Sequence, residues 1–423
     1  MPIWSVRLTV TREAQTMTKV SGHPILHALW LSLGSASAQG LARFAYALML
    51  PSMKDSLGWT FAQAGGMNSA NAAGYLVGAF MANFVLMRWS PRSTFIASAL
   101  ITSASLIAMG GASQFWVLLA FRLVGGISSA VLFIAGGVLG AQLASVDRSR
   151  SGLLLAIYYG GVGIGVILSG ICIPWLLASS LVNQWRWAWV LLGVLSLLPA
   201  IFALLFRLPA SVNPQPGKST RAVGLFRLAP ALISYLLFGA GYIGYMTFVI
   251  STLRESGMGS WQFVSSFWVL LGLAIFVSSW VWAWLLDRSE SGRGLALLQV
   301  VVCAGAVLPV LSTHPWAMLG SAALFGGSFL MVVSGTTALV RKALPKERWS
   351  QGIVAFTIAF ALGQMVGPTL TGKVLDVSQS STTGLAVSVL LVGIAAVVAL
   401  LQRRVSTPKV SKGEPPTPAM RRA

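Results

Sequence analysis

The placement of basic residues restricts this chain to a membrane protein with many spans. Twelve apolar runs divide the sequence, and 23 of its 29 Lys and Arg residues lie in the two tails and in alternate gaps between the runs. Four more lie in the other gaps, and Arg43 and Arg122 lie inside apolar runs. Cytoplasmic loops carry an excess of Lys and Arg. The pattern therefore predicts twelve transmembrane helices with both termini in the cytoplasm.

Composition supports a membrane protein and argues against other classes. The chain is 56% hydrophobic and 9% charged, with a mean hydropathy of +0.79, whereas soluble domains contain about 25% charged residues. The net charge of +20 would otherwise favour nucleic-acid binding. Because the positive loops account for it, we expect a lipid bilayer as partner and no nucleic acid. Cys172 and Cys303 fall in apolar runs and are too few for a metal cluster, so we expect no metal or cofactor.

The apolar runs have the length of membrane-spanning helices, about 20 residues each. The predicted spans are 26–50, 66–87, 93–112, 115–142, 152–177, 186–206, 229–252, 260–286, 293–312, 315–340, 351–373 and 382–402. Three prolines and four basic residues make 207–228 a polar linker. The predicted organisation is an N-terminal tail (1–25), a six-helix half (26–206), the linker (207–228), a second six-helix half (229–402) and a C-terminal tail (403–423). No signal peptide is recognised, and Met17 offers a second plausible start.

The two halves look like repeats of each other. Gly161, Gly165 and Gly170 in the fifth span have the same spacings as Gly363, Gly367 and Gly372 in the eleventh, at an offset of 202. Arg88 and Arg288 follow the second and eighth spans at an offset of 200. Repeats of this kind are common in secondary transporters. The expected fold is an all-α polytopic protein with two pseudo-repeated six-helix halves.

Several short motifs strengthen this interpretation. Asp287, Arg288, Gly292 and Arg293 follow the eighth span in an order similar to D-R-x-G-R, with two extra residues. The first half keeps Arg88 and Arg92 but has Met87 at the Asp position. The other motifs are RLVGGISSA in the fourth span, GQMVGPTLTG in the eleventh, GLARFAYALMLPSM at 40–53 and FGAGYIGYMTF at 238–248.

Together these motifs resemble the major facilitator superfamily, and within it a bacterial branch labelled YbfB-like. The resemblance covers about residues 25–402 and implies a secondary transporter of the bacterial inner membrane that works by alternating access. We expect a monomer. The resemblance also implies that Arg88, Arg92, Asp287 and Arg288 act at the cytoplasmic gate. Met87 puts the gate contact of the first half in doubt. Gly367 and Pro368 are gating candidates because proline can bend a helix.

A polar layer inside the membrane is the candidate substrate site. An arginine at a helix centre costs about 2.5–3.5 kcal/mol on insertion scales, so Arg43 and Arg122 need a reason to be there. Counted from the periplasmic ends, they lie at a depth of about 8–14 Å with several polar residues. The candidate substrate-binding residues are Gln39, Arg43, Tyr46, Asn71, Tyr75, Arg122, Tyr242, Tyr245 and Gln364. The planar guanidinium of Arg43 would hold a carboxylate, phosphate or sulfonate.

Structural roles stay open for each of these residues. Arg43 could bond to backbone carbonyls, Arg122 could serve packing or conformational coupling, and Asn71 and Gln364 could join helices by hydrogen bonds. The tyrosines could be core aromatics.

Acidic residues are missing from the apolar runs. All nine lie in loops, tails or helix ends, which argues against a buried proton relay and against cationic cargo. The expected substrate is a small organic anion, and a negative cell interior favours its export or exchange. The alternative is an exporter of neutral sugars or lipophilic drugs. A membrane-embedded enzyme or sensor is a third class, but no catalytic cluster is found. No phosphate-binding G-x-x-x-x-G-K-[ST] motif is present, so we do not expect ATP as the energy source.

Overall fold

The computed structural model describes residues 24–146, 148–205, 225–288, 291–345 and 348–404, and within these ranges the chain is helical without strands. The predicted tails and linker lie mostly outside the described residues. The first group contains α2 (Pro24–Ser35), the π-helix η1 (Ala36–Phe44), α3 (Tyr46–Leu57), α4 (Phe61–Arg88), α5 (Pro91–Gly111), α6 (Phe115–Val146), η2 (Arg148–Arg150), α7 (Ser151–Leu177), α8 (Gln184–Leu195) and α9 (Leu198–Leu205). The second group contains η3 (Leu225–Leu228), α10 (Ala229–Glu255), α11 (Trp261–Arg288), α12 (Gly292–Leu311), α13 (Pro315–Gly326), α14 (Phe329–Ala343), α15 (Trp349–Ser378) and α16 (Ser381–Leu400).

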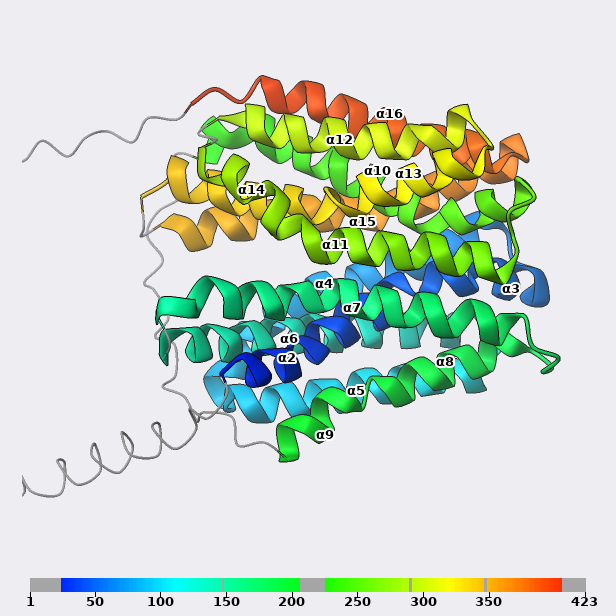
Figure 1. Cartoon of the computed structure of the whole chain (residues 1–423), viewed down its shortest axis with the longest axis horizontal. Coiled ribbons are helices and arrows are strands. Elements are labelled where there is room, and N and C mark those ends of the chain that lie inside the picture. Colours follow the sequence, from blue (N-terminus) through cyan, green and yellow to red (C-terminus); the bar gives the residue numbers. More distant parts are fainter. Residues whose placement is uncertain (1–23, 147, 206–224, 289–290, 346–347, 405–423) are drawn as a thin grey trace, which may run out of the picture.

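The predicted fold class is confirmed. Figure 1 shows the two groups side by side, and α4 and α7 of the first contact α15 and α11 of the second. Within the described residues, eleven helical segments are long and apolar enough to span a membrane. The sixth and tenth spans are each built from two helices, α8–α9 and α13–α14. The path α2–η1–α3 supplies the first span, which is divided by its π-helix.

The first span differs from its prediction in length and in form. It continues to Leu57, and Pro51 lies inside α3 instead of ending the helix. Between α2 and α3, the N–H of Ala45 donates to the carbonyl of Gly40, five residues earlier, at 3.0 Å. A π-helix is rare and often marks a functional site. Hydrophobic length alone could not predict this widening, because the length of an apolar run does not show whether its turns are α-helical or π-helical.

The repeated glycines occupy equivalent positions in the two groups. A Cβ atom at Gly161 or Gly165 would overlap carbonyl oxygens of the first span, and one at Gly363 or Gly367 would overlap carbonyl oxygens of α10. These pairs let each group's helices pack backbone to backbone. The third glycine of each triad faces the other group instead: Gly170 packs on Trp268 of α11, and Gly372 on Phe61 of α4.

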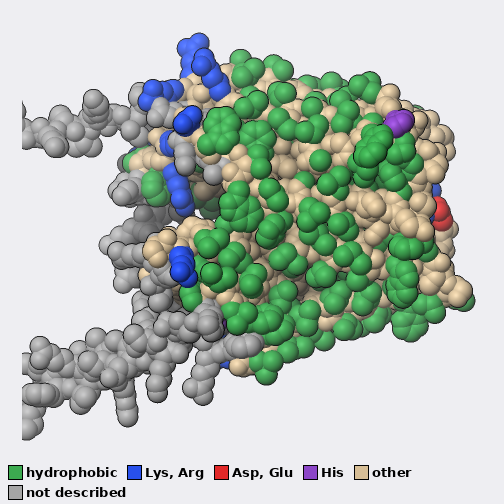
Figure 2. All heavy atoms as spheres, in the orientation of Figure 1, with side chains coloured by type: hydrophobic (Ala, Val, Ile, Leu, Met, Phe, Trp, Pro, Cys, Tyr) green, Lys and Arg blue, Asp and Glu red, His purple; other side chains and the backbone are tan. Residues whose placement is uncertain are grey.

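The surface has the distribution of charge expected for a membrane protein. Figure 2 shows a broad apolar face, with Lys and Arg gathered at one end. We call this the basic end and the other the opposite end. The residues that mark the basic end are Arg88, Arg92, Arg288, Arg293, Arg403 and Arg404. The chain is therefore a multi-pass membrane protein, with an apolar belt that matches the bilayer core.

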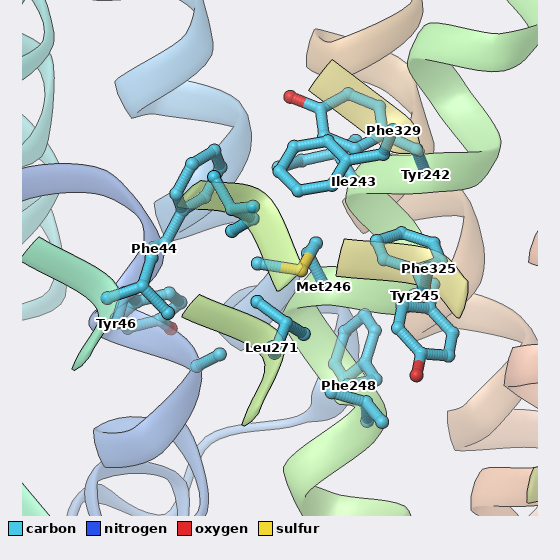
Figure 3. Packing of buried hydrophobic residues seen from close by; sticks show 14 of the residues in the cluster. Phe44, Tyr46, Tyr242, Ile243, Tyr245, Met246, Phe248, Leu271, Phe325 and Phe329 are labelled. Atoms are coloured by element: carbon cyan, nitrogen blue, oxygen red, sulfur yellow. The ribbon is translucent and has the colours of Figure 1, made fainter. Parts of the chain in front are cut away.

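An aromatic core joins the two groups around α10. Figure 3 shows Phe44 of η1 close to Ile243 and Met246, and the rings of Phe44 and Phe329 meet edge to face at 5.8 Å. The ring of Tyr242 lies nearly parallel to those of Phe238, Phe329 and Phe360, with centroids 5.3–5.6 Å away. This core surrounds the candidate site.

Candidate substrate site

The π-helix η1 carries the two polar residues at the centre of the site. All its residues are buried, and Gly40 lets it approach the backbone of α7 at Gly165. Gln39 Nε2 donates a hydrogen bond of 2.9 Å to the hydroxyl of Tyr75, and the guanidinium of Arg43 lies 4.9 Å from the centroid of the same ring. Gln39 and Arg43 of η1 therefore both contact Tyr75 of α4.

A chain of side chains connects the two groups at mid-depth. Arg43 Nη2 donates to Gln364 Oε1, and Gln364 Nε2 donates to the hydroxyl of Tyr242. Arg43, Gln364 and Tyr242 are each at most 4% exposed. Tyr75, Tyr242 and Gln364 all lie near the midpoints of their helices. The structure thus brings Gln39, Arg43, Tyr75, Tyr242 and Gln364 together, and residues from both groups contribute.

Arg43 uses little of its hydrogen-bonding capacity. A guanidinium has five N–H donors, and within the described residues only Nη2 of Arg43 has a partner, Gln364. Its other two nitrogens have no hydrogen-bond partner among the described residues, but they are not completely buried. No described carboxylate lies within salt-bridge distance of it. An anionic ligand would supply the missing acceptors.

Arg122 is bonded in a different way. It donates through Nη1 to the carbonyl of Ala42 (2.7 Å), through Nε to that of Met67 (3.3 Å) and through Nη2 to Asn68 Oδ1 (3.0 Å). Its guanidinium also lies 4.8 Å from the ring of Tyr46 and 5.6 Å from that of Trp189. All three nitrogens are used, so Arg122 ties η1 to α4 and α6.

Asn68 is not among the predicted site residues, yet it lies at the centre of a second connection between the groups. Its Oδ1 accepts from Arg122, and its Nδ2 donates to Thr247 Oγ1 of α10 at 2.7 Å. The residue is 5% exposed. A single asparagine in a span is a weak sequence signal. Its spacing of three residues from Asn71, on one face of the helix, was the available clue.

Three other candidates form hydrogen bonds outside the group around Arg43. Asn71 Nδ2 donates to the carbonyl of Arg122 (3.2 Å), while its buried Oδ1 has no partner among the described atoms. Tyr46 donates to the carbonyl of Ala64 (2.7 Å). Tyr245 bonds to Ser321 Oγ. Figure 3 shows the hydroxyls of Tyr242 and Tyr245 directed to different sides.

The gating candidates fall into separate environments. Arg88 and Arg288 are exposed at the basic end, and the side chain of Asp287 lies outside the described part of the chain. Arg92 donates to the carbonyl of Ala203 through Nε (3.1 Å) and Nη2 (2.9 Å), which caps α9 within its own group. Gly367 packs on α10, whereas the carbonyl of Pro368 faces Gly65 of α4 in the other group.

The fold and this site can be compared with known proteins. A family model described as "Uncharacterised MFS-type transporter YbfB" matches residues 35–401. The chain belongs to this family. It is therefore a membrane transporter of the major facilitator type, a family that moves small molecules across membranes, and the expected resemblance is confirmed.

Individual relatives agree with this assignment. The chain is 27% identical over 399 residues to the chloramphenicol resistance protein of Streptomyces lividans, covering 90% of this chain and 97% of the relative. It is 24% identical over 350 residues to the inner membrane transport protein YdhP of Escherichia coli O157:H7, covering 80% and 87%.

Solved structures show the same fold. A POT family transporter in complex with 5-aminolevulinic acid has a TM-score of 0.71 at 14% identity, covering 90% of this chain and 96% of that one. The nucleoside transporter NupG has a TM-score of 0.68 at 15% identity, covering 90% and 98%.

Proposed function

We propose that this protein transports a small organic anion across the bacterial inner membrane by alternating access, and that Arg43 anchors the anion. The observation that carries this proposal is the contrast between the two intramembrane arginines. Arg122 donates through all three of its nitrogens, whereas Arg43 donates once, to a neutral amide. A buried cation without a counter-ion is costly, and an anionic substrate would lower that cost.

The surroundings of Arg43 are suited to exchange one partner for another. A carboxylate binding to the guanidinium would displace Gln364 Oε1, because a two-pronged Arg–carboxylate pair is stronger than one hydrogen bond to a neutral amide. Gln364 and Gln39 each carry amide donors, and Tyr75 and Tyr242 each carry a hydroxyl, so further polar groups of a ligand would find partners. The rings of Phe329 and Phe360 would contact its apolar part.

Transport requires the site to open to each side in turn. The contacts described between the two groups lie at mid-depth or toward the opposite end, for example Arg43 with Gln364 and Ser69 with Thr369. On the predicted topology the opposite end is periplasmic and both termini are cytoplasmic, so this conformation is closed to the periplasm. The half at 26–206 would rock against the half at 229–402. Arg88, Arg92, Asp287 and Arg288 would bias the basic-end gate, with bending at Gly367 and Pro368.

Energetics favour export or exchange over uptake. One anionic charge leaving a cell with a negative interior gains about 2.3 kcal/mol per 100 mV. Uptake would require a co-transported cation or a steep gradient. Uptake of the anion into proteoliposomes driven by a pH gradient would contradict this direction.

A second candidate function is export of neutral sugars or lipophilic drugs by a monomer of the same fold. It is favoured by the relative named for chloramphenicol resistance and by the parallel rings around Tyr242. Such cargo would bind through ring contacts, and Arg43 would contribute little.

A ligand screen by thermal unfolding separates the two functions. Carboxylates, sugars and lipophilic drugs are compared on the wild type, Arg43→Ala and Arg43→Lys, since a ligand that binds only the folded state stabilises it by RT ln(1 + [L]/Kd). The anion proposal expects stabilisation by a carboxylate that is lost in Arg43→Ala and weakened in Arg43→Lys, which keeps the charge without the planar fork. Stabilisation by drugs or sugars that is unchanged in both variants would favour the second function.

A further inference from the structure

The first turn of α4 is bonded by side chains from both groups. Thr60 and Gln63 form a capping box: Gln63 N–H donates to Thr60 Oγ1 (3.1 Å) and Thr60 N–H donates to Gln63 Oε1 (2.9 Å). The N–H groups of Phe61 and Ala62 donate instead to Asp376 of α15, to Oδ1 at 2.7 Å and to Oδ2 at 2.9 Å. Two of the first N–H groups of α4 are therefore satisfied by one carboxylate of the other group.

This contact lies in a tightly packed seam at the opposite end. A Cβ atom at Gly372 would overlap the carbonyl of Phe61, and one at Gly65 would overlap that of Pro368. The hydroxyls of Ser69 and Thr369 are 2.9 Å apart. Helices α4 and α15 cannot separate at this end without losing both hydrogen bonds to Asp376.

The carboxylate of Asp376 at the N-terminus of α4 is both electrostatically favourable and partly accessible to water. A carboxylate at a helix N-terminus is stabilised by the helix dipole as well as by its hydrogen bonds. Asp376 is only half-buried, so water can replace its partners when the seam opens.

We propose that Asp376 is the latch of the opposite-end gate, and that release of its carboxylate from the N-terminus of α4 is required for that end to open. This role concerns the gate alone and does not depend on which substrate binds at Arg43.

Glu255 supplies a matched control. Glu255 Oε2 accepts from the N–H of Ser381, the first residue of α16, at 3.0 Å. Both residues of this pair belong to the second group. Glu255→Gln and Asp376→Asn each neutralise a carboxylate at a helix N-terminus near the same end, but only Asp376 joins helices that must move apart.

Disulfide formation between Ser69→Cys and Thr369→Cys measures how often the seam is closed. The full chain is reconstituted in proteoliposomes with Cys172→Ser and Cys303→Ser. The oxidation rate is recorded for this parent, and again after adding Asp376→Asn or Glu255→Gln. We expect Asp376→Asn to slow cross-linking about fivefold, the effect of one charge at a helix N-terminus, and Glu255→Gln to leave it unchanged. Equal rates in the parent and Asp376→Asn, or equal slowing by both variants, would overturn the proposal.

A second pair of variants tests the donor side without altering Asp376. Phe61→Pro and Phe61→Ala both remove the ring, but only proline removes the N–H, and the first helical position tolerates proline well. We expect slower cross-linking in Phe61→Pro than in Phe61→Ala, and no difference between them once Asp376→Ala, which removes both acceptor oxygens, is also present. A difference that persists in the Asp376→Ala background would show that proline acts through the helix itself and would refute the latch.

Discussion

Replacing each intramembrane arginine by alanine should separate structure from binding. Arg43→Ala and Arg122→Ala delete the same side chain, so the loss of apolar contact from the side chain itself is similar. They differ in what is left behind. Without Arg122, two backbone carbonyls and Asn68 Oδ1 lose their donor. Without Arg43, only Gln364 Oε1 does.

The difference in stability follows from these contacts. Hydrogen bonds between helices in membranes average about 0.6 kcal/mol, and a guanidinium over a ring adds about 0.5–1 kcal/mol. Three bonds and two rings make the loss for Arg122→Ala about 3 kcal/mol. One bond and one ring make it about 1 kcal/mol for Arg43→Ala, and relief of a poorly paired buried cation offsets part of that. We expect Arg122→Ala to be less stable by about 2 kcal/mol.

Reversible unfolding in mixed micelles measures this difference, and binding is measured on the same samples. Arg122→Ala should retain its ligand at temperatures where it is folded, whereas Arg43→Ala should be nearly as stable as the wild type and lose the ligand. If Arg43→Ala is destabilised as much as Arg122→Ala, the reasoning that assigns Arg43 to substrate and Arg122 to structure is refuted.

Three further predictions concern the gates and the core. Gly65→Ala should force α4 and α15 apart at the carbonyl of Pro368 and favour opening of the opposite end. Gly66→Ala should have no effect, because nothing lies within 4 Å of its Cβ position. Spin-label distances across the seam measure both variants, and equal effects would contradict the packing argument. Tyr245→Phe should lower stability by about 1 kcal/mol through the lost hydrogen bond while ligand affinity stays unchanged, and a large loss of affinity would place Tyr245 in the site. Asp287→Asn should slow transport more than it weakens binding, as compared by flux and equilibrium binding, and equal losses would argue against a gating role.

Much of the candidate site could be predicted as a set of residues but not as a set of contacts. Arg43, Gln39 and Tyr75 were recognisable because polar groups are rare in apolar runs and stand out there. Their common contact depends on the π-helix η1, which rotates the residues after Ala36 relative to an α-helix. Arg43 and Arg122 were predicted at similar depths, but their hydrogen bonds differ completely. Asn68 was overlooked because its partners, Arg122 and Thr247, come from other helices.

Asp376 illustrates the same limit outside the membrane core. From the sequence it was one of nine acidic residues at loops and helix ends. Only the packing of α15 against α4 places its carboxylate at two N–H groups of the first turn of α4.

The number of spans, their order and the repeat of the two halves could be read from the amino-acid sequence. Each of these follows from the thickness of the bilayer, the cost of apolar surface in water and the spacing of small residues, which act locally along the chain. Packing between the helices settles which arginine keeps unused donors and which carboxylate joins the two groups. Those outcomes depend on the rotation and axial position of each helix against its neighbours, which are set by packing between segments far apart in the sequence.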